Sequence, residues 1–182
     1  MYTLKESDHT TWTIPRLSYP VKAAVMELQY DEYGAGNPHR LHAHLFAKGL
    51  AASGLDSEYG AYLDEAPLEV LMQNNVMSLF GLNRRLRAAS LGFHAAFEAT
   101  SSAPSRKIAR GLQRLDFPPE MVEYYTEHVE ADSVHEQLAV RTMCGTLIEE
   151  EPEQHANVWF GAWAYLHVED LYGERMLTEW SA

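Results

Sequence analysis

The sequence predicts an all-α protein, a bundle of about six or seven helices around one core. Three observations support this prediction. Apolar residues recur at helical spacing along most of the chain, no segment alternates cleanly as a half-buried strand does, and proline and glycine residues divide the chain into pieces of helical length. From the length of 182 residues we expect one domain, covering residues 1–182.

The helix boundaries follow from proline and glycine positions along the chain. Residues 1–20 are polar and interrupted by Pro15 and Pro20, so we expect a loop there, or a frayed helix end near residues 4–8. Beyond them, the predicted helices cover residues 21–33, 38–53, 67–100, 105–115, 120–142 and 153–179. The long third helix is expected to bend near Gly81 or Gly92.

Three of these boundaries rest on local signals. Pro38 is expected in the first turn of the second helix, where its missing N–H costs nothing. The segment SSAPS, residues 101–105, is expected to be a capped turn between the third and fourth helices. The fifth helix is expected to extend toward Ile148, before the acidic break at residues 149–152.

Composition narrows the class of function. A net charge of −12 argues against nucleic acid and anionic membranes as partners. The single cysteine, Cys144, rules out an intrachain disulfide and fits a reducing compartment. The N-terminal residues lack the apolar run of a signal peptide, and no stretch reaches about 18 apolar residues, so we expect a cytoplasmic protein.

The segment from Glu120 to Thr142 carries the strongest functional pattern. His128, Asp132 and His135 stand at i, i+4 and i+7, which puts their side chains on one helical face. The rest of that stripe is Met121, Tyr125, Ala139 and Thr142. Titratable groups on a core-facing stripe need partners, and a metal ion is the simplest partner for two imidazoles and a carboxylate. A solvated face is the alternative.

Other segments offer groups that would complete such a site. Glu32 ends the first helix on its apolar stripe, and His42 follows a short glycine-containing reversal. Glu27 and Asp31 are alternatives to Glu32, but Glu32 is the one on the apolar stripe. His39 and His44 are alternatives to His42, but their neighbours are polar or small. Surface or capping roles are the alternative for every one of them.

Two further glutamates are weaker candidates when judged from the residues alone. Glu98 lies beside small and apolar neighbours near the end of a long helix, where it is either a ligand or a solvated helix end. His94, four residues earlier, would also satisfy it by a simple contact. Glu6 stands in a polar segment, where a surface position is the usual outcome.

Three motifs together carry a resemblance to a known family. The motifs DEYGAGNPHRLHAHLF, AAFEATSSAPSRKIARGLQRL and YYTEHVEADSVHEQLA resemble, in that order, those of the haem-oxygenase-like non-haem diiron oxidases and oxygenases, the iron-containing redox enzymes. The segment LKESDHTTWTIPRL resembles the one that precedes the first ligand helix of that family. The resemblance runs from about Leu4 to about Trp180 and implies a haem-oxygenase-like helical bundle.

The resemblance also implies a set of metal ligands and a chemistry. By position, the ligands are Glu32, His42, Glu98, His128, Asp132 and His135, with Glu6 where some members have an additional glutamate. Glu98 is the implied bridging carboxylate. Two non-haem iron ions would then use O2 as co-substrate to oxidise a small organic molecule. Amine N-oxygenation, fatty-acid desaturation or decarboxylation, and amino-acid C–C cleavage all occur in the group, and the sequence does not select among them.

Other functions and an assembly state also follow as expectations. In many relatives the segment before the first ligand helix is longer than it is here. This difference motivates an alternative function, a non-catalytic metal-binding or scaffold domain that completes a larger partner. Haem oxygenase is disfavoured because haem needs an axial histidine rather than many carboxylates. A thiamin-degrading enzyme needs a nucleophilic cysteine, and Cys144 follows Met143 near a helix end. Supporting roles beside the ligands are open to Tyr33, Tyr124, Tyr125 and His94.

A homodimer is the expected assembly. Its basis is the last helix, whose aromatic side chains are spread over more than one face, so that packing one face leaves others exposed. These residues are Trp159, Phe160, Trp163, Tyr165 and Tyr172.

Overall fold

The computed structural model describes residues 1–181, apart from the side chains of Glu130, Asp132 and Ser133. Its α-helices are α1 (Asp8–Thr11), α2 (Tyr19–Glu32), α3 (His42–Ala52), α4 (Leu68–Leu82), α5 (Arg87–Arg114), α6 (Pro119–Gln137), α7 (Thr146–Glu150) and α8 (His155–Trp180). Short 3-10 helices are η1 (Tyr2–Lys5), η2 (Ile14–Arg16), η3 (Gly34–Gly36), η4 (Arg84–Leu86) and η6 (Pro152–Gln154), and η5 (Leu138–Gly145) is a π-helix. These residues form no strand, which confirms the all-α class.

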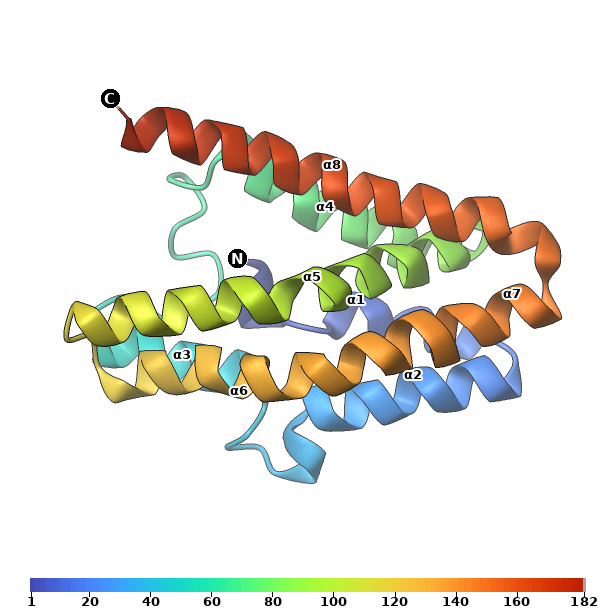
Figure 1. The fold of residues 1–182 in the computed structure, drawn as a ribbon, viewed down its shortest axis with the longest axis horizontal. Helices are drawn as coiled ribbons and strands as arrows, with labels where there is room; N and C mark the ends of the chain where they lie inside the picture. The colour runs from blue at the N-terminus through green and yellow to red at the C-terminus, as the bar shows by residue number, and fades with distance from the viewer. Residues whose placement is uncertain (182) are drawn as a thin grey trace.

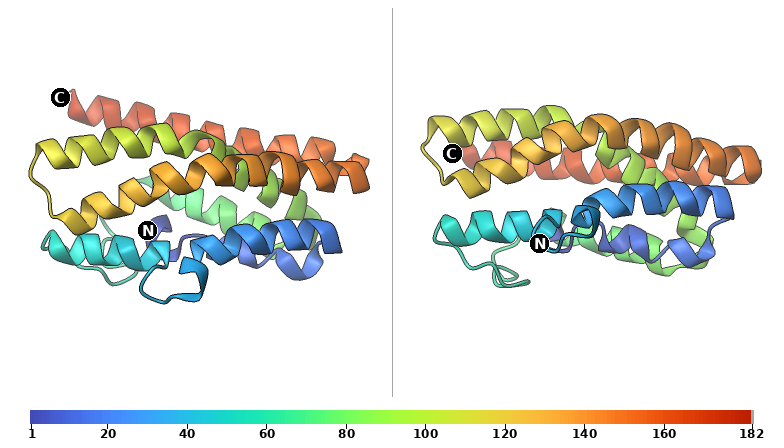
Figure 2. Two further views of the ribbon diagram at one scale, coloured as in Figure 1. Left: turned by 60° about the horizontal axis from the view of Figure 1, so that its bottom comes forward. Right: turned by 90° about the horizontal axis from the view of Figure 1, so that it is seen from below.

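The helices lie in two layers along the long axis of the molecule (Figure 1, Figure 2). One layer holds α5, α8 and the continuous rod of α6, η5 and α7. In the other layer, α2 and α3 follow one another beneath that rod (Figure 2). Helix α3 packs on α6, and α2 packs on η5 and α7. The junction between α2 and α3 therefore faces the middle of the rod. No helix among the described residues is long and apolar enough to cross a membrane.

Two buried apolar clusters flank α5. One joins α2, α5 and η5 and includes Leu28, Leu91 and Met143, while the other joins α4, α5 and α8 and includes Phe80 and Tyr165. Helix α5 contributes to both because every residue from Ala88 to Ala95 is buried, leaving no exposed face over that stretch. It is thus the central helix of the fold.

Helices α5 and α8 cross with their backbones in direct contact. A Cβ atom added at Gly92 would lie 2.0 Å from the carbonyl oxygen of Val158, and one added at Gly161 would lie 1.9 Å from that of Ala89. No side chain fits at either position, so a glycine on each helix allows this close approach.

Two predicted helix boundaries are wrong. Helix α3 begins at His42 rather than near Pro38, because a turn follows η3 in which the Asn37 side chain accepts a hydrogen bond from the His39 N–H at 3.0 Å. Residues 101–105 form no turn, since α5 continues through Pro104 to Arg114. An internal proline costs about 3 kcal/mol, and packing of α5 against α6 and α8 outweighs that cost.

The helix predicted over residues 67–100 does not merely bend near Gly81 but is interrupted there, because α4 ends at Leu82 and α5 starts at Arg87 after η4. The stripe of α6 also changes course. Ala139 is buried as expected, but Thr142 is exposed and Met143 is buried instead. The wider turns of the π-helix η5 shift the inward face by one residue, and such segments are frequent beside functional sites.

Candidate metal centre

Six buried side chains gather where the junction of α2 and α3 faces α6. They form two groups, Glu6 with His42 and His128, and Glu32 with Glu98 and His135. Within each group, one possible ligand atom per residue lies within 4.8 Å of the others. Six of the seven ligands expected from the sequence therefore lie together. The seventh, Asp132, has its side chain outside the described part of the structure.

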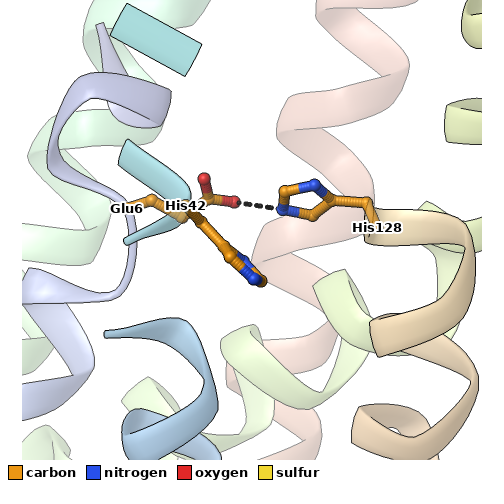
Figure 3. A group of neighbouring side chains, drawn as sticks. All are labelled: Glu6, His42 and His128. Atoms are coloured by element: carbon orange, nitrogen blue, oxygen red, sulfur yellow. Dashed lines mark hydrogen bonds and ion pairs between the residues drawn. The ribbon is translucent and has the colours of Figure 1, made fainter. Parts of the chain in front are cut away.

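The first group joins the N-terminal segment, α3 and α6 (Figure 3). His128 Nε2 lies 3.1 Å from Glu6 Oε1, and the His42 and His128 rings are 4.5 Å apart. The Tyr124 hydroxyl donates to Glu6 Oε2 at 3.0 Å. At the other side of the His128 ring, Nδ1 donates to the carbonyl oxygen of Tyr124 at 2.7 Å. This bond fixes the ring and turns Nε2 inward.

The second group joins α2, α5 and α6. His135 Nδ1 lies 3.3 Å from Glu32 Oε1 and 3.6 Å from Glu98 Oε2. Its other ring nitrogen lies 3.5 Å from Asp31 Oδ2, at the exposed edge of the site. His94 Nε2 stands 3.2 Å from Glu98 Oε1, one helical turn away on α5.

Glu32 connects the two groups. Its Oε1 atom lies 3.3 Å from His42 Nδ1 in the first group and 3.3 Å from His135 Nδ1 in the second. Its Oε2 atom accepts a hydrogen bond from the Ser7 hydroxyl at 2.9 Å. As the last residue of α2, Glu32 points between α3 and α6. This geometry favours Glu32 as the shared carboxylate, where the family resemblance implied Glu98.

The donor atoms fit a metal ion. His42 Nδ1 and His135 Nδ1 are buried and make no hydrogen bond among the described residues, although each faces a carboxylate oxygen. A cation between the imidazoles and the carboxylates would satisfy both, and a mixed set of nitrogen and oxygen donors suits iron.

The ionisation of the metal-free site compensates for its buried carboxylates. Burial favours the neutral imidazole, but contact with Glu6 raises the pKa of His128 to about 10, and contact with Glu32 and Glu98 raises that of His135 to about 11. Burial opposes the charge of Glu32 as well, yet its contacts with His135 and His42 hold its pKa well below the usual range. The protonated imidazoles of the metal-free site therefore supply the positive charge that bound cations would supply.

His94 behaves differently from those two imidazoles. Burial lowers its pKa to about 4, so its ring is neutral although Glu98 is 3.2 Å away.

Comparison with known proteins agrees with this geometry. The sequence profile of the family described as iron-containing redox enzyme matches residues 1–170. The chain belongs to this family. It is also 25% identical over 130 residues to a nitrosourea synthase from Streptomyces achromogenes subsp. streptozoticus, a match that covers 71% of this chain and 28% of that protein. The chain thus spans well under half the length of this curated relative.

The outcome for the weaker sequence candidates is mixed. His39, His44 and Glu27 are exposed and take no part in either group. Among the supporting aromatic residues, Tyr124 contacts the site, whereas Tyr33 donates to Asp8 at 3.1 Å. Tyr125 packs its ring edge-on against that of Tyr124.

Sequence reasoning missed Ser7, whose hydroxyl holds Glu32. A hydroxyl next to Glu6 in the motif LKESDHTTW was the available signal.

An open groove of about 510 Å³ leads from solvent to this iron-containing redox enzyme's candidate centre. His42 and His135 form part of its wall, and Asp31, Arg40 and Glu127 surround them. Arg40 and Glu127 pair across the groove at 2.8 Å. A volume of this size is typical of small-molecule sites.

Proposed function

We propose that the chain is an O2-dependent oxidoreductase that holds two non-haem iron ions and oxidises a small organic substrate. One ion would be held by Glu6, His42 and His128, the other by Glu98, His135 and Asp132, with Glu32 shared between them. The observation that carries the proposal is the position of Glu32 Oε1, 3.3 Å from an imidazole nitrogen of each group. A shared carboxylate holds two cations close together and offsets their repulsion.

When bound, ferrous iron supplies electrons and open coordination positions for O2. The chain's own residues supply orientation. The hydroxyl groups of Ser7 and Tyr124 donate hydrogen bonds to the carboxylates of Glu32 and Glu6, respectively, and so fix their orientation. The Tyr124 carbonyl fixes the His128 ring. Hydrogen bonds of this kind preserve ligand geometry, and their loss typically weakens metal binding about 10–100-fold.

The open groove is the route we propose for the organic substrate, because it reaches His42 and His135 directly. The charged groups of Asp31, Arg40 and Glu127 along it suit a polar molecule. Since the curated relative is named for making a nitrosourea, we place amines and other nitrogen compounds first among the substrates to test.

Anaerobic titration with ferrous iron, followed by metal analysis and an optical spectrum after mixing with O2, tests the proposal. We expect two iron ions per chain and a new absorption band with O2. Glu32→Ala should weaken the binding of both ions, whereas Glu6→Ala should mainly weaken the binding of one. Glu27→Ala is the matched control, because it removes an exposed carboxylate from the same helix. Two tightly bound ions in Glu32→Ala would contradict the shared role.

The non-catalytic alternative predicts a different result in the same experiment. A metal-binding scaffold would load iron but show no O2 uptake that depends on added substrate. Measuring O2 consumption with a panel of amines and carboxylic acids therefore separates the enzyme from the scaffold.

A further inference from the structure

Asp31 lies beside the candidate centre, in the wall of the open groove. It precedes Glu32 on α2, and its side chain is 52% exposed. Its Oδ2 atom lies 3.5 Å from His135 Nε2. The sequence offered Asp31 as an alternative ligand to Glu32, and the proposed function gives it no part. Because Asp31 contacts a proposed ligand from the solvent side, it can act on the centre through that ligand.

The two nitrogen atoms of the His135 ring have different surroundings. On the inner side, Nδ1 lies 3.3 Å from Glu32 Oε1 and 3.6 Å from Glu98 Oε2, and it makes no hydrogen bond among the described residues. On the outer side, Nε2 faces Asp31. An imidazole binds a metal ion through the nitrogen that carries no proton, and its other nitrogen keeps the N–H. This arrangement leaves Nδ1 to a metal ion and puts the N–H at Nε2.

The His128 ring is oriented in the opposite sense. Its Nδ1 donates to the carbonyl oxygen of Tyr124 at 2.7 Å, and its Nε2 lies 3.1 Å from Glu6 Oε1, inside the first group. Each of the two rings therefore meets one oxygen atom on the side away from its group. For His128 this atom is a carbonyl oxygen of its own helix, whereas for His135 it belongs to a carboxylate of α2.

We infer that Asp31 is the positioning residue of His135. Its carboxylate accepts a hydrogen bond from the Nε2–H and thereby directs Nδ1 toward the second metal ion. The inference rests on the proposed function, because it concerns one of the proposed ligands. Two consecutive residues of α2 then have separate tasks, since Glu32 binds the ions and Asp31 orients an imidazole that binds one of them. A carboxylate in this place also makes the imidazole a stronger ligand.

The contact between Asp31 and His135 should shorten when a metal ion binds. Its length of 3.5 Å exceeds the usual range of about 2.7–3.2 Å for a hydrogen bond. A cation at Nδ1 withdraws electrons from the ring, which makes the Nε2–H a stronger donor. In crystals of the protein loaded with Zn²⁺, which accepts nitrogen and oxygen ligands, we expect Oδ2 within about 3.2 Å of Nε2. A zinc ion bound by Nε2, or by Asp31 itself, would overturn the inference.

Nuclear magnetic resonance tests the ring orientation in solution, without any turnover. In zinc-loaded protein with ¹⁵N-labelled histidine, we expect His135 to bind through Nδ1 and to keep its proton at Nε2, while His128 shows the reverse pattern. The His135→Gln variant identifies the His135 signals by their absence. Because the parent protein is measured, this experiment does not depend on the folding of an Asp31 variant. A proton at Nδ1 of His135 would contradict the inference.

Two substitutions separate the hydrogen bond of Asp31 from its charge. Asp31→Ala should weaken Co²⁺ binding at the second group about tenfold and leave the first group unchanged in calorimetric titrations. Asp31→Asn keeps an oxygen that can accept from the Nε2–H, so its loss should be smaller. Glu27→Ala, the matched control, removes an exposed carboxylate one turn earlier on α2 and should have no effect. Equal losses in Asp31→Ala and Glu27→Ala would show a general effect of charge and end the inference.

Metal loading and O2 consumption separate this inference from the proposed function. If the protein binds two ions and consumes O2, but Asp31→Ala keeps the parental affinity, the inference fails and the proposed function stands. If Asp31 orients His135 in the zinc-loaded protein, but the iron-loaded protein consumes no O2, the inference stands and the proposed function fails. A protein that binds no metal ion at the second group would end both.

Discussion

The Tyr124 hydroxyl lies 3.0 Å from Glu6 Oε2, and this bond attaches the N-terminal segment to α6 at the first group of the candidate centre. Tyr124→Phe removes the bond and keeps the ring. We expect metal affinity at the first group to fall by about tenfold, while the second group is spared. Calorimetric titration with Co²⁺ would resolve the two sites. Tyr125→Phe is the control, and an equal loss in both variants would argue against the role of Tyr124.

Metal loading should release protons. Because the pKa values of His128 and His135 in the metal-free protein are about 10 and about 11, both rings are protonated at both nitrogens and positively charged at neutral pH. A bound cation displaces those protons, so apparent affinity should rise with pH, by about tenfold per pH unit for each proton released. Titration in buffers of different ionisation enthalpy measures the number released. Identical heats in all buffers would contradict the prediction.

The centre could be predicted in part from the sequence because short-range patterns carry it. Helical spacing placed His128 and His135 on one face, and the apolar stripe of α2 favoured Glu32 over Asp31. Both histidines and Glu32 are buried, whereas Asp31 is exposed. The role of these residues as metal ligands, like that of Asp132, stays a prediction.

Long-range contacts explain what the sequence alone did not show. Nothing in the polar segment around Glu6 indicates burial, since its partners Tyr124 and His128 come from more than a hundred residues away. Pro104 is read locally as a helix end, but α5 packs along its length against two helices. Tertiary packing outweighs local preference there.

Cys144 should be chemically inert in the folded protein. Burial raises the pKa of its thiol to about 12, so almost no thiolate forms at pH 8. We expect a disulfide reagent such as DTNB to react within minutes only after unfolding in guanidinium chloride. Fast reaction of the native protein would contradict this prediction. It would support Cys144 as a nucleophile, the role that a thiamin-degrading enzyme would need.

The homodimer remains a prediction, and α8 shows where its interface would lie. Trp159, Phe160 and Trp163 are 55%, 54% and 65% exposed, whereas Tyr165 packs inside against Phe93. Light scattering at micromolar concentration should give the mass of two chains. Trp163→Arg should lower that mass toward one chain, while Tyr19→Arg, at an exposed aromatic residue on another helix, should not. A monomeric parent protein would end the idea.

Two glycine-to-alanine substitutions on α8 should change stability in opposite directions, because only one of them lies at the close crossing with α5. Gly161→Ala places a Cβ 1.9 Å from the carbonyl oxygen of Ala89, and two backbones cannot separate without opening the core between them. We expect a loss of at least about 2 kcal/mol in the free energy of unfolding. Gly173→Ala is the matched control, because a Cβ there meets no atom within 4 Å.

That control should raise the free energy of unfolding by about 0.5–1 kcal/mol, since alanine restricts the unfolded chain and favours a helix more than glycine does. Urea unfolding followed by circular dichroism measures both variants. Because α5 also carries Glu98 and His94, a shift of the crossing moves one wall of the candidate centre. Gly161→Ala should therefore weaken metal binding as well as stability, and Gly173→Ala should leave metal binding unchanged. A stable Gly161→Ala protein with parental metal affinity would show that the helices need not approach so closely.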